Sequence, residues 1–236
     1  MKFSSAILNE NAQGFAAVIP DIKCVSPKEG DLLRGRDPVE TARLLMDYGA
    51  PVLSVVTESE HFGGSAELLR SIAAIGVPVL RKDFIASEAQ LHETLDLGAA
   101  AVLLICAITS EENLAVLYRK SLELGLEPLV EIHTAAEMAL ASSLGAKLVG
   151  INNRNITTLE RDGGGPARTA QLAAGAPKGA LLISESGILT PQDATKVVAA
   201  GANAVLVGTA LWQADDMAAA YQSLRVELEN MPCAQS

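Results

Sequence analysis

The 236-residue chain has few aromatic residues, few charged residues and no long apolar segment. Aromatic residues make up 3% and charged residues 19%, and so low a charge argues against a long coiled coil. The longest apolar run, residues 99–108, is too short to cross a bilayer, and residues 1–13 lack the apolar core of a secretory signal. We therefore expect a protein that neither enters a membrane nor is secreted, and a cytoplasmic location is the simple interpretation.

Cysteine and basic residues are also scarce. Cys24, Cys106 and Cys233 are widely spaced, without a Cys-x-x-Cys or Cys/His cluster, so the sequence predicts neither a disulfide framework nor a metal site. Eighteen Lys and Arg residues against 28 Asp and Glu give a net charge of −10. A chain this acidic is repelled by phosphate backbones and anionic lipid, which argues against nucleic acid or membranes as partners. A small anionic molecule is compatible with this charge if a few basic residues converge in one pocket.

Apolar residues, by contrast, make up 49% of the chain and recur in eight short runs rich in Val, Ile and Leu. Several runs are almost continuously apolar, as is typical of parallel strands covered on both faces. The gaps between them leave room for one crossover helix each. The predicted strands are residues 16–19, 51–56, 78–81, 100–105, 127–132, 147–151, 180–184 and 203–208.

The segments between these strands carry helix start and stop signals. Asp37 followed by Pro38 is typical of a helix start, and Ser87 with Gln90 three positions later has the spacing of a capping box. A glycine ends each predicted helix, where it fits a left-handed conformation without a Cβ clash. The predicted helices, each with its terminal glycine, are residues 37–49, 87–98, 110–125, 134–145, 166–175 and 190–201.

Eight strand–helix units without a low-complexity linker predict an α/β fold, a single-domain (β/α)8 TIM barrel over residues 1–236 with a short N-terminal segment, residues 1–15. The competing architecture is an open doubly wound sheet. That fold calls for a glycine-rich turn after the first strand, whereas the sequence continues there as DIKCVSPKEG. The barrel is therefore the preferred interpretation.

Five predicted strands end in ionisable or amide residues, although strands buried on both faces are expected to be apolar. Such groups are costly to bury unless they point into a wet, paired site, and the carboxyl ends of the strands carry the chemistry in this type of barrel. A convergent polar site follows, although Asp21 alone is also compatible with a structural ion pair to Lys23 or Lys82. The residues at these ends are Asp21 and Lys23, Lys82, Glu131 and His133, Asn152 and Arg154, and Glu185 and Ser186.

Small residues follow the last two strands, at Ser186-Gly187 and Gly208-Thr209. Small side chains let backbone N–H groups approach an anion, and the loops after strands seven and eight are the usual phosphate site of this barrel. We therefore expect a phosphorylated small molecule to bind there. The triple glycine 163–165 lacks the lysine of a nucleotide-binding loop and is interpreted as a hinge.

The strings IPDIKCVSPKEG, VLRKDFI, LVEIH, GINNRN, ISESGI and VLVGTAL occur in this order at successive strand ends, together with SVVTESEHFGGS. In this combination the chain resembles the indole-3-glycerol phosphate synthase family of tryptophan biosynthesis, over roughly residues 15–225. The resemblance implies a carbon–carbon lyase without a cofactor. Its reaction closes the ring of 1-(2-carboxyphenylamino)-1-deoxyribulose 5-phosphate, with loss of carbon dioxide and water.

The resemblance also implies roles for catalytic residues. Lys82 would be the general acid that protonates the ketone oxygen, and Glu131 the general base that assists dehydration. Lys23 would contact phosphate and donate a proton, and Asn152 would orient the substrate hydroxyls. Asp21 stands where the family usually has a glutamate of the catalytic hydrogen-bond network, one methylene longer, so a difference in rate is expected.

The implied substrate-binding residues surround this catalytic set. Ser26 and Arg154 would hold the anthranilate carboxylate, and Glu185 would belong to the polar site at strand seven. Ser186-Gly187 and Gly208-Thr209 would form the phosphate cradle. The first loop, residues 24–38, is our candidate lid.

Two other functions remain open from the sequence alone. One is another sugar-phosphate barrel, such as phosphoribosylanthranilate isomerase, which needs an acid and a base but no site for loss of carbon dioxide. The other is a catalytically silent barrel that binds a phosphorylated ligand or a partner enzyme; Asp21 and the N-terminal segment, shorter than is common in the family, would be its support. A homo-oligomer is compatible with each of these hypotheses.

Overall fold

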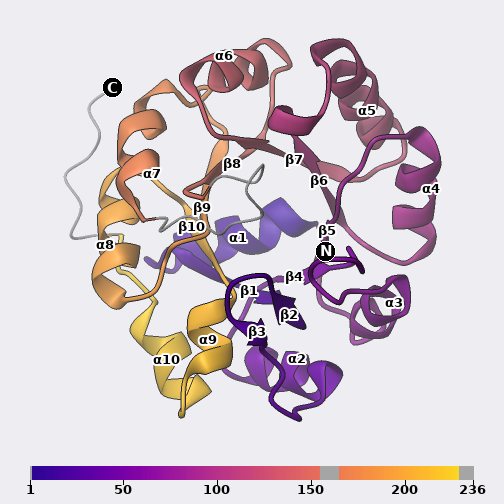
Figure 1. The fold of residues 1–236 in the computed structure, drawn as a ribbon. Coiled ribbons are helices and arrows are strands. Elements are labelled where there is room, and N and C mark those ends of the chain that lie inside the picture. Colours follow the sequence, from indigo (N-terminus) through magenta and orange to yellow (C-terminus); the bar gives the residue numbers. More distant parts are fainter. Residues whose placement is uncertain (1, 155–164, 229–236) are drawn as a thin grey trace.

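Eight parallel strands close into a barrel in the computed structural model, which describes residues 2–154 and 165–228 (Figure 1). Each strand pairs with the barrel strand next to it along the chain, and β10 closes the ring by pairing with β1. The predicted (β/α)8 barrel is confirmed, and the closed ring excludes the open doubly wound sheet. The barrel strands are β1 (Ala17–Ile22), β4 (Leu53–Val56), β5 (Val79–Lys82), β6 (Ala101–Ile105), β7 (Glu127–Ile132), β8 (Leu148–Asn152), β9 (Leu181–Glu185) and β10 (Ala204–Val207).

All helices except α1 lie around the outside of the strands (Figure 1). Asp37 caps its helix by accepting from the backbone N–H groups of Val39 and Glu40, and Ser87 and Gln90 form the predicted capping box. The terminal glycines have positive φ as expected, except Gly175, which lies in a 3-10 turn. The helices are α1 (Phe3–Ala12), α2 (Pro38–Asp47), α3 (Ala66–Ala73), α4 (Glu88–Asp96), α5 (Glu111–Glu123), α6 (Ala135–Ser143), α7 (Ala167–Leu172), α8 (Pro191–Ala199), α9 (Thr209–Gln213) and α10 (Met217–Ser223), with 3-10 turns η1 (Cys106–Ile108) and η3 (Ala173–Gly175).

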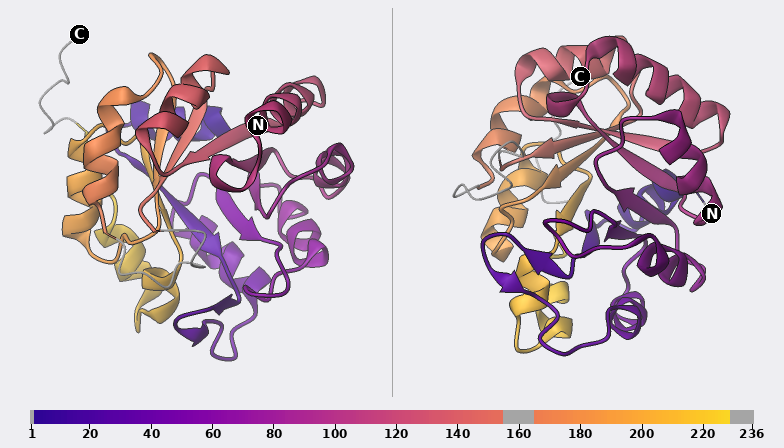
Figure 2. Two further views of the ribbon diagram at one scale, coloured as in Figure 1. Left: turned by 45° about the horizontal axis from the view of Figure 1, so that its top comes forward. Right: turned by 45° about the vertical axis from the view of Figure 1, so that its right-hand side comes forward.

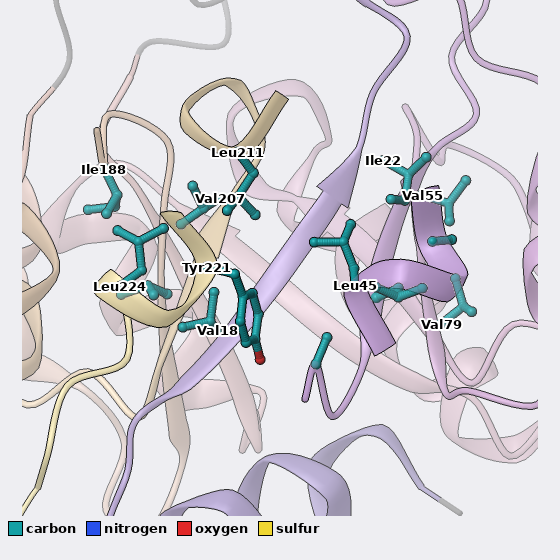
Figure 3. Close-up of a cluster of buried hydrophobic side chains, with 14 of the residues drawn as sticks. Val18, Ile22, Leu45, Val55, Val79, Ile188, Val207, Leu211, Tyr221 and Leu224 are labelled. Carbon is teal, nitrogen blue, oxygen red and sulfur yellow. The ribbon is translucent and has the colours of Figure 1, made fainter. Parts of the chain in front are cut away.

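The main core lies between the strands and the ring of helices. Alternation along β1 directs Val18 and Ile22 outward, where they join a buried cluster with Leu45 of α2 and Tyr221 of α10 (Figure 3). A second cluster of the same kind fills the space between β6–β9 and helices α4–α6. These outward-facing residues bury the strands from outside and leave the inward-facing residues to form the barrel interior.

Helix α1 closes the amino-terminal end of the barrel, which the sequence analysis did not predict for residues 1–15. Phe3, Ala6 and Ile7 are buried against interior residues at the first positions of several strands, such as Ala17 and Leu148. The views in Figures 1 and 2 show α1 crossing behind the strands, away from the loops that follow their carboxyl ends. Because one end of the interior is plugged, the interior is open only at the carboxyl ends.

The start of α1 is anchored by a carboxylate from the barrel. The Glu127 side chain at the beginning of β7 accepts hydrogen bonds from the backbone N–H of Ser4 at 3.1 Å and from the Ser4 hydroxyl. A negative charge at a helix start also complements the helix dipole. This contact joins residues 123 positions apart and fixes the plug to the wall.

A short antiparallel hairpin, β2 (Val25–Ser26) and β3 (Gly30–Asp31), lies inside the loop that was predicted as a lid. The end of this loop is tied down by Arg36, whose guanidinium donates to the carbonyl of Trp212 in α9 and lies 5.1 Å from the Trp212 ring centroid. The structure thus shows an ordered loop with a fixed base, and its closing over a ligand stays a prediction. Within the described residues, no helix combines the length and the apolar composition needed to cross a membrane.

The plug makes a stability prediction. Phe3 is fully buried on α1, whereas Leu8 on the same helix is 51% exposed. We expect Phe3→Ala to lower the free energy of unfolding by about 3–5 kcal/mol, because it leaves a cavity under the barrel. Leu8→Ala, the matched control, should change it by less than about 0.5 kcal/mol. Urea denaturation followed by circular dichroism measures both, and equal effects would contradict the plug.

Candidate active site

Two adjoining cavities open at the carboxyl ends of the strands, with volumes of about 380 and 350 Å³. Asp21, Lys23 and Lys82 line both of them, so these three side chains form the shared wall. The first cavity is further lined by Val56, Glu58, Phe62, Asp83, Phe84, Leu103, Ile105 and Glu131. The second is further lined by Arg154, Ser186, Gly187, Ile188, Leu189, Leu206, Val207, Gly208 and Thr209.

The alternation of β1 places Asp21 in the cavities. Ala17 and Ile19 face the apolar interior, so Asp21 shares their side of the strand and stands above them. Its Oδ1 accepts a hydrogen bond of 2.7 Å from the Ser54 hydroxyl on β4, and its backbone carbonyl accepts one of 2.9 Å from the Trp212 indole N–H. Two neighbouring elements therefore hold the end of β1 in place.

Lys23 continues the same face one step beyond β1. It is buried, and its ammonium lies 5.6 Å from the centroid of the Phe62 ring. A cation over an aromatic face is attracted by the ring quadrupole, so Phe62 helps to direct this side chain over the cavities.

Lys82 at the end of β5 forms an ion pair with Glu185 at the end of β9, with 3.2 Å between Nζ and Oε2. Glu185 is completely buried. Burial is the main cause that raises the pKa of Glu185, to about 7. The attraction of Lys82 lowers this pKa, whereas repulsion from Glu131 and Asp21 raises it. Burial therefore outweighs the attraction of Lys82 and holds the pKa of this carboxyl above its ordinary value.

The residues on either side of Lys82 fix the end of β5 from outside the barrel. Arg81 is buried and donates to the Thr57 hydroxyl at 3.1 Å, to Asp83 at 3.0 Å and to Glu93 of α4 at 2.9 Å. Thr57 in turn donates to Asp83 at 2.6 Å. This network ties β5 to the loop after β4 and to α4, so the backbone that carries Lys82 has little freedom.

Glu131 lies on the inward face of β7 and is fully buried. His133, two residues on, lies between it and α6: its Nε2 is 3.6 Å from Glu131 Oε1, and its Nδ1 is 3.7 Å from Glu137 Oε2. His133 therefore lies within ion-pair distance of two carboxylates, one on β7 and one on α6.

The two adjacent asparagines at the end of β8, Asn152 and Asn153, make different hydrogen bonds. Asn152 accepts from the backbone N–H of Arg154 at 3.0 Å, while its buried Nδ2 has no hydrogen-bond partner among the described residues. Asn153 instead donates to the carbonyls of Glu185 and Ser186, at 2.9 and 3.1 Å, and so holds the end of β9. The Nδ2 of Asn152 is thus a buried donor that no described residue satisfies, although it lines neither cavity.

The four residues predicted to form a phosphate cradle, Ser186, Gly187, Gly208 and Thr209, all line the second cavity, and their binding of phosphate stays a prediction. Ser186 has φ +60°, an unusual conformation for a residue with a side chain. Such strain is found where the backbone has to be presented in a particular direction. The backbone of this turn, rather than its side chains, is the constrained feature of the cradle.

Three predicted site residues do not line either cavity as described. Glu185 lies behind Lys82 as its partner, and Asn152 is buried at the end of β8. Ser26 lies in β2, where its hydroxyl accepts from the backbone N–H groups of Lys28 and Glu29 at 3.4 and 3.3 Å. Its role toward a carboxylate stays a prediction. Of the triple glycine, Gly163 and Gly164 lie outside the described residues.

The sequence analysis missed Ser54, Phe62 and Phe84 as parts of the site. Ser54 interrupts the apolar run PVLSVV, which is the same signal that singled out Glu131. Phe84 directly follows the polar end of β5 in the string VLRKDFI. Phe62 had no comparable signal, because it reaches the cavity from the loop after β4.

One group of residues in the described chain has the composition of a metal site: Glu58, Glu60 and His61, whose ligand atoms lie within 4.8 Å of one another. Partial burial raises the pKa of Glu58, but hydrogen bonds from His61, from Phe62 and from the backbone N–H of Glu60 outweigh it and hold the pKa below its ordinary value. Glu58 therefore serves to cap the loop after β4.

The raised pKa of Glu185 predicts a pH dependence of stability. Between its ordinary value of 4.5 and about 7, the folded protein binds more protons at this site than the unfolded chain. We therefore expect the unfolding free energy, relative to that of Glu185→Gln, to fall as pH rises through this window and to level off above it. Urea denaturation of both proteins at intervals from pH 4.5 to 8 measures this difference, and a constant difference would contradict the raised pKa.

Comparison with known sequences bears on the family to which the chain belongs. The sequence model of the family "Indole-3-glycerol phosphate synthase" matches residues 1–224. Two relatives described as indole-3-glycerol phosphate synthase, from Streptococcus pneumoniae strains Taiwan19F-14 and CGSP14, are each 41% identical over 219 residues, which is 92% of this chain and 84% of each relative.

Among solved structures, thiamine phosphate pyrophosphorylase from Pyrococcus furiosus superimposes with a TM-score of 0.63 at 14% identity. The match covers 89% of this chain and 93% of that one, and at this identity it supports the fold alone. The family match over almost the whole chain and the 41% identity carry the assignment, which confirms the resemblance seen in the sequence. The chain belongs to the indole-3-glycerol phosphate synthase family, the carboxy-lyases of tryptophan biosynthesis.

Proposed function

We propose that the chain closes the indole ring of 1-(2-carboxyphenylamino)-1-deoxyribulose 5-phosphate at the shared wall of the two cavities. The observation that carries this proposal is that Lys23 and Lys82 line both cavities. In the substrate, the ketone lies between the aromatic ring and the phosphate along the covalent chain. With the ring in one cavity and the phosphate in the other, the ketone falls beside these two ammonium groups.

The lining of each cavity supports this placement. Phe62, Phe84, Val56, Leu103 and Ile105 give the first cavity an apolar wall that suits an aromatic ring. The second cavity has the small residues of the phosphate cradle, and their backbone can approach phosphate oxygens closely.

Charged and amide groups would bind the rest of the substrate. Arg154 lines the second cavity, so it would reach the ring carboxylate only where that carboxylate points from the first cavity across the shared wall. The buried Nδ2 of Asn152 is a donor for a sugar hydroxyl.

Ring closure would be driven by proton donation from Lys82. The aromatic carbon that carries the carboxylate attacks the ketone carbon, and the ketone oxygen takes a proton from Lys82 as the new carbon–carbon bond forms. The bond to the carboxylate then breaks, carbon dioxide leaves, and its electron pair restores the aromatic ring. No electron sink beyond the substrate itself is needed for this step.

Dehydration would need the acid and a base together. The hydroxyl formed from the ketone leaves as water with a proton from a lysine, and Glu131 removes a proton from the neighbouring carbon to form the double bond. Lys82 and Glu131 line the same cavity, and Lys23 stands beside them as a second donor. Asp21 orients this end of the site through Ser54.

We place the reaction in the cytoplasm. Cys24 and Cys106 are free thiols, as is typical of proteins in a reducing compartment.

Loss of the proposed acid or base should reduce turnover far more than stability. We expect Lys82→Ala and Glu131→Gln each to lower kcat at least about a hundredfold, because removal of a general acid or base costs roughly 10²–10⁴ in rate. Indole fluorescence follows turnover of the carboxyphenylamino-deoxyribulose phosphate, and thermal denaturation checks the fold. Near-normal kcat with a lower Tm in Lys82→Ala would instead show that Lys82 serves only as a structural ion-pair partner.

The phosphate cradle predicts an unequal response at two adjacent residues. A side chain at Gly208 would block the approach to the backbone and press on Asp21, whose Cβ lies 3.3 Å from where the new Cβ would be. We expect Gly208→Val to weaken competitive inhibition by inorganic phosphate at least about tenfold more than Thr209→Ala does, since the cradle acts mainly through backbone N–H groups. Equal inhibition constants in the two variants would contradict this assignment.

A further inference from the structure

Gly150 is the only glycine in the eight barrel strands, all of which are described. Glycine weakens a strand, because it loses more backbone freedom on folding and gives no side chain to pack. The φ of Gly150 is outside the left-handed region, so its backbone conformation does not call for glycine. The reason for a glycine here has to be the space beside it.

That space is occupied by the Glu185 carboxylate. A Cβ at Gly150 would stand 2.0 Å from Glu185 Oε1 and 3.2 Å from its Cδ, whereas the next atom, Leu129 Cδ1, would be at an ordinary 3.6 Å. The conflict is thus with Glu185 alone. The missing side chain of Gly150 leaves a recess in the barrel wall into which one carboxylate oxygen fits.

The strand register places this recess between two buried glutamates. Gly150 of β8 pairs with Glu131 of β7 on one side and with Ile183 of β9 on the other, two residues before Glu185. In the recess, Glu185 Oε1 makes no hydrogen bond within the described part of the chain, while Oε2 lies on Lys82 Nζ. Shape, rather than hydrogen bonding, therefore holds one oxygen, and the other is directed at Lys82.

We propose that Gly150 is a positioning residue: its recess orients the Glu185 carboxylate and thereby keeps Lys82 where it donates its proton. The proposal rests on the function of Lys82 proposed above. The recess also accounts for the orientation of the Glu185 carboxylate toward Lys82 in an interior that Glu131 shares. Without the recess, the Glu185 carboxylate is displaced and no longer holds the Lys82 ammonium in place.

The experiment is a double-mutant cycle of Gly150→Ala with Glu185→Ala. A methyl group at Gly150 meets the far end of a flexible side chain, so the fold should adapt and Tm should change little. We expect Gly150→Ala to lower kcat at least about tenfold with KM within about threefold. In the Glu185→Ala background the same change should cost less than about twofold, because the carboxylate it displaces is gone.

Gly175→Ala is the matched control. Gly175 also lacks a left-handed φ, its added Cβ would lie at an ordinary 3.4 Å from Met138 Cγ, and it lies in η3, outside both cavities. We expect this variant to keep the kcat, KM and Tm of the unchanged protein. A fall in kcat here equal to that of Gly150→Ala would overturn the proposal, since any added methyl group would then have the same effect.

Each remaining outcome decides the question. The proposal is overturned if Gly150→Ala leaves kcat unchanged. It is also overturned if Gly150→Ala lowers kcat equally in the unchanged protein and in Glu185→Ala. Should Gly150→Ala fail to fold, folding of the double variant supports a clash with Glu185, and failure of both overturns it. Lys82→Ala separates the two proposals. A near-normal kcat in Lys82→Ala overturns the proposed acid role of Lys82. Non-additive effects of Gly150→Ala and Glu185→Ala on kcat test the role of the recess independently.

Discussion

The buried ion pair between Lys82 and Glu185 is the interaction on which the rest of the site depends. Taking both charges out of water is expensive, and a buried pair is tolerated only with close geometry. The structure supplies that geometry from two sides: the Arg81 network fixes the strand that carries Lys82, and the recess at Gly150 fixes the carboxylate. Such a pair is weak support for stability, and its place in the interior agrees with the proton donation proposed for Lys82.

The division of the barrel interior into an apolar and a polar half follows from the same constraint. Inward-facing residues near the strand starts, such as Ile19 and Leu148, pack on α1 and exclude water. Charged residues at the strand ends can then occupy one solvated mouth without weakening the whole core. The plug at one end of the barrel and the ionisable residues at the other are therefore parts of one arrangement.

Much of the fold was predictable because its signals are local. Apolar runs predicted all eight strands, and caps such as Asp37 predicted helix starts, since both depend on neighbouring residues, although α3 after Ser65 was not among the predicted helices. The plug and the hairpin β2–β3 were missed because α1 is defined by what it packs against, and a two-residue strand has no periodicity. The partner of Lys82 was equally hidden: Glu185 lies 103 residues away, and only the closed ring brings the two strand ends face to face. Polar residues within or at the end of apolar runs indicated the candidate site residues. They do not indicate which of these side chains contact each other in the fold.

Asp21 links the two halves of the site more closely than its place at the end of β1 suggests. Its carboxylate is held by Ser54, and its Cβ lies 3.3 Å from the position that a side chain at Gly208 would take. Asp21 therefore lies both at the wall shared by the two cavities and against Gly208 of the proposed phosphate cradle. The aspartate side chain is short, and the hydrogen bond from Ser54 holds its carboxylate between β1 and β4. Asp21 thereby lies at the wall that both cavities share, beside Lys23 and Lys82, where the proposed function places the substrate ketone.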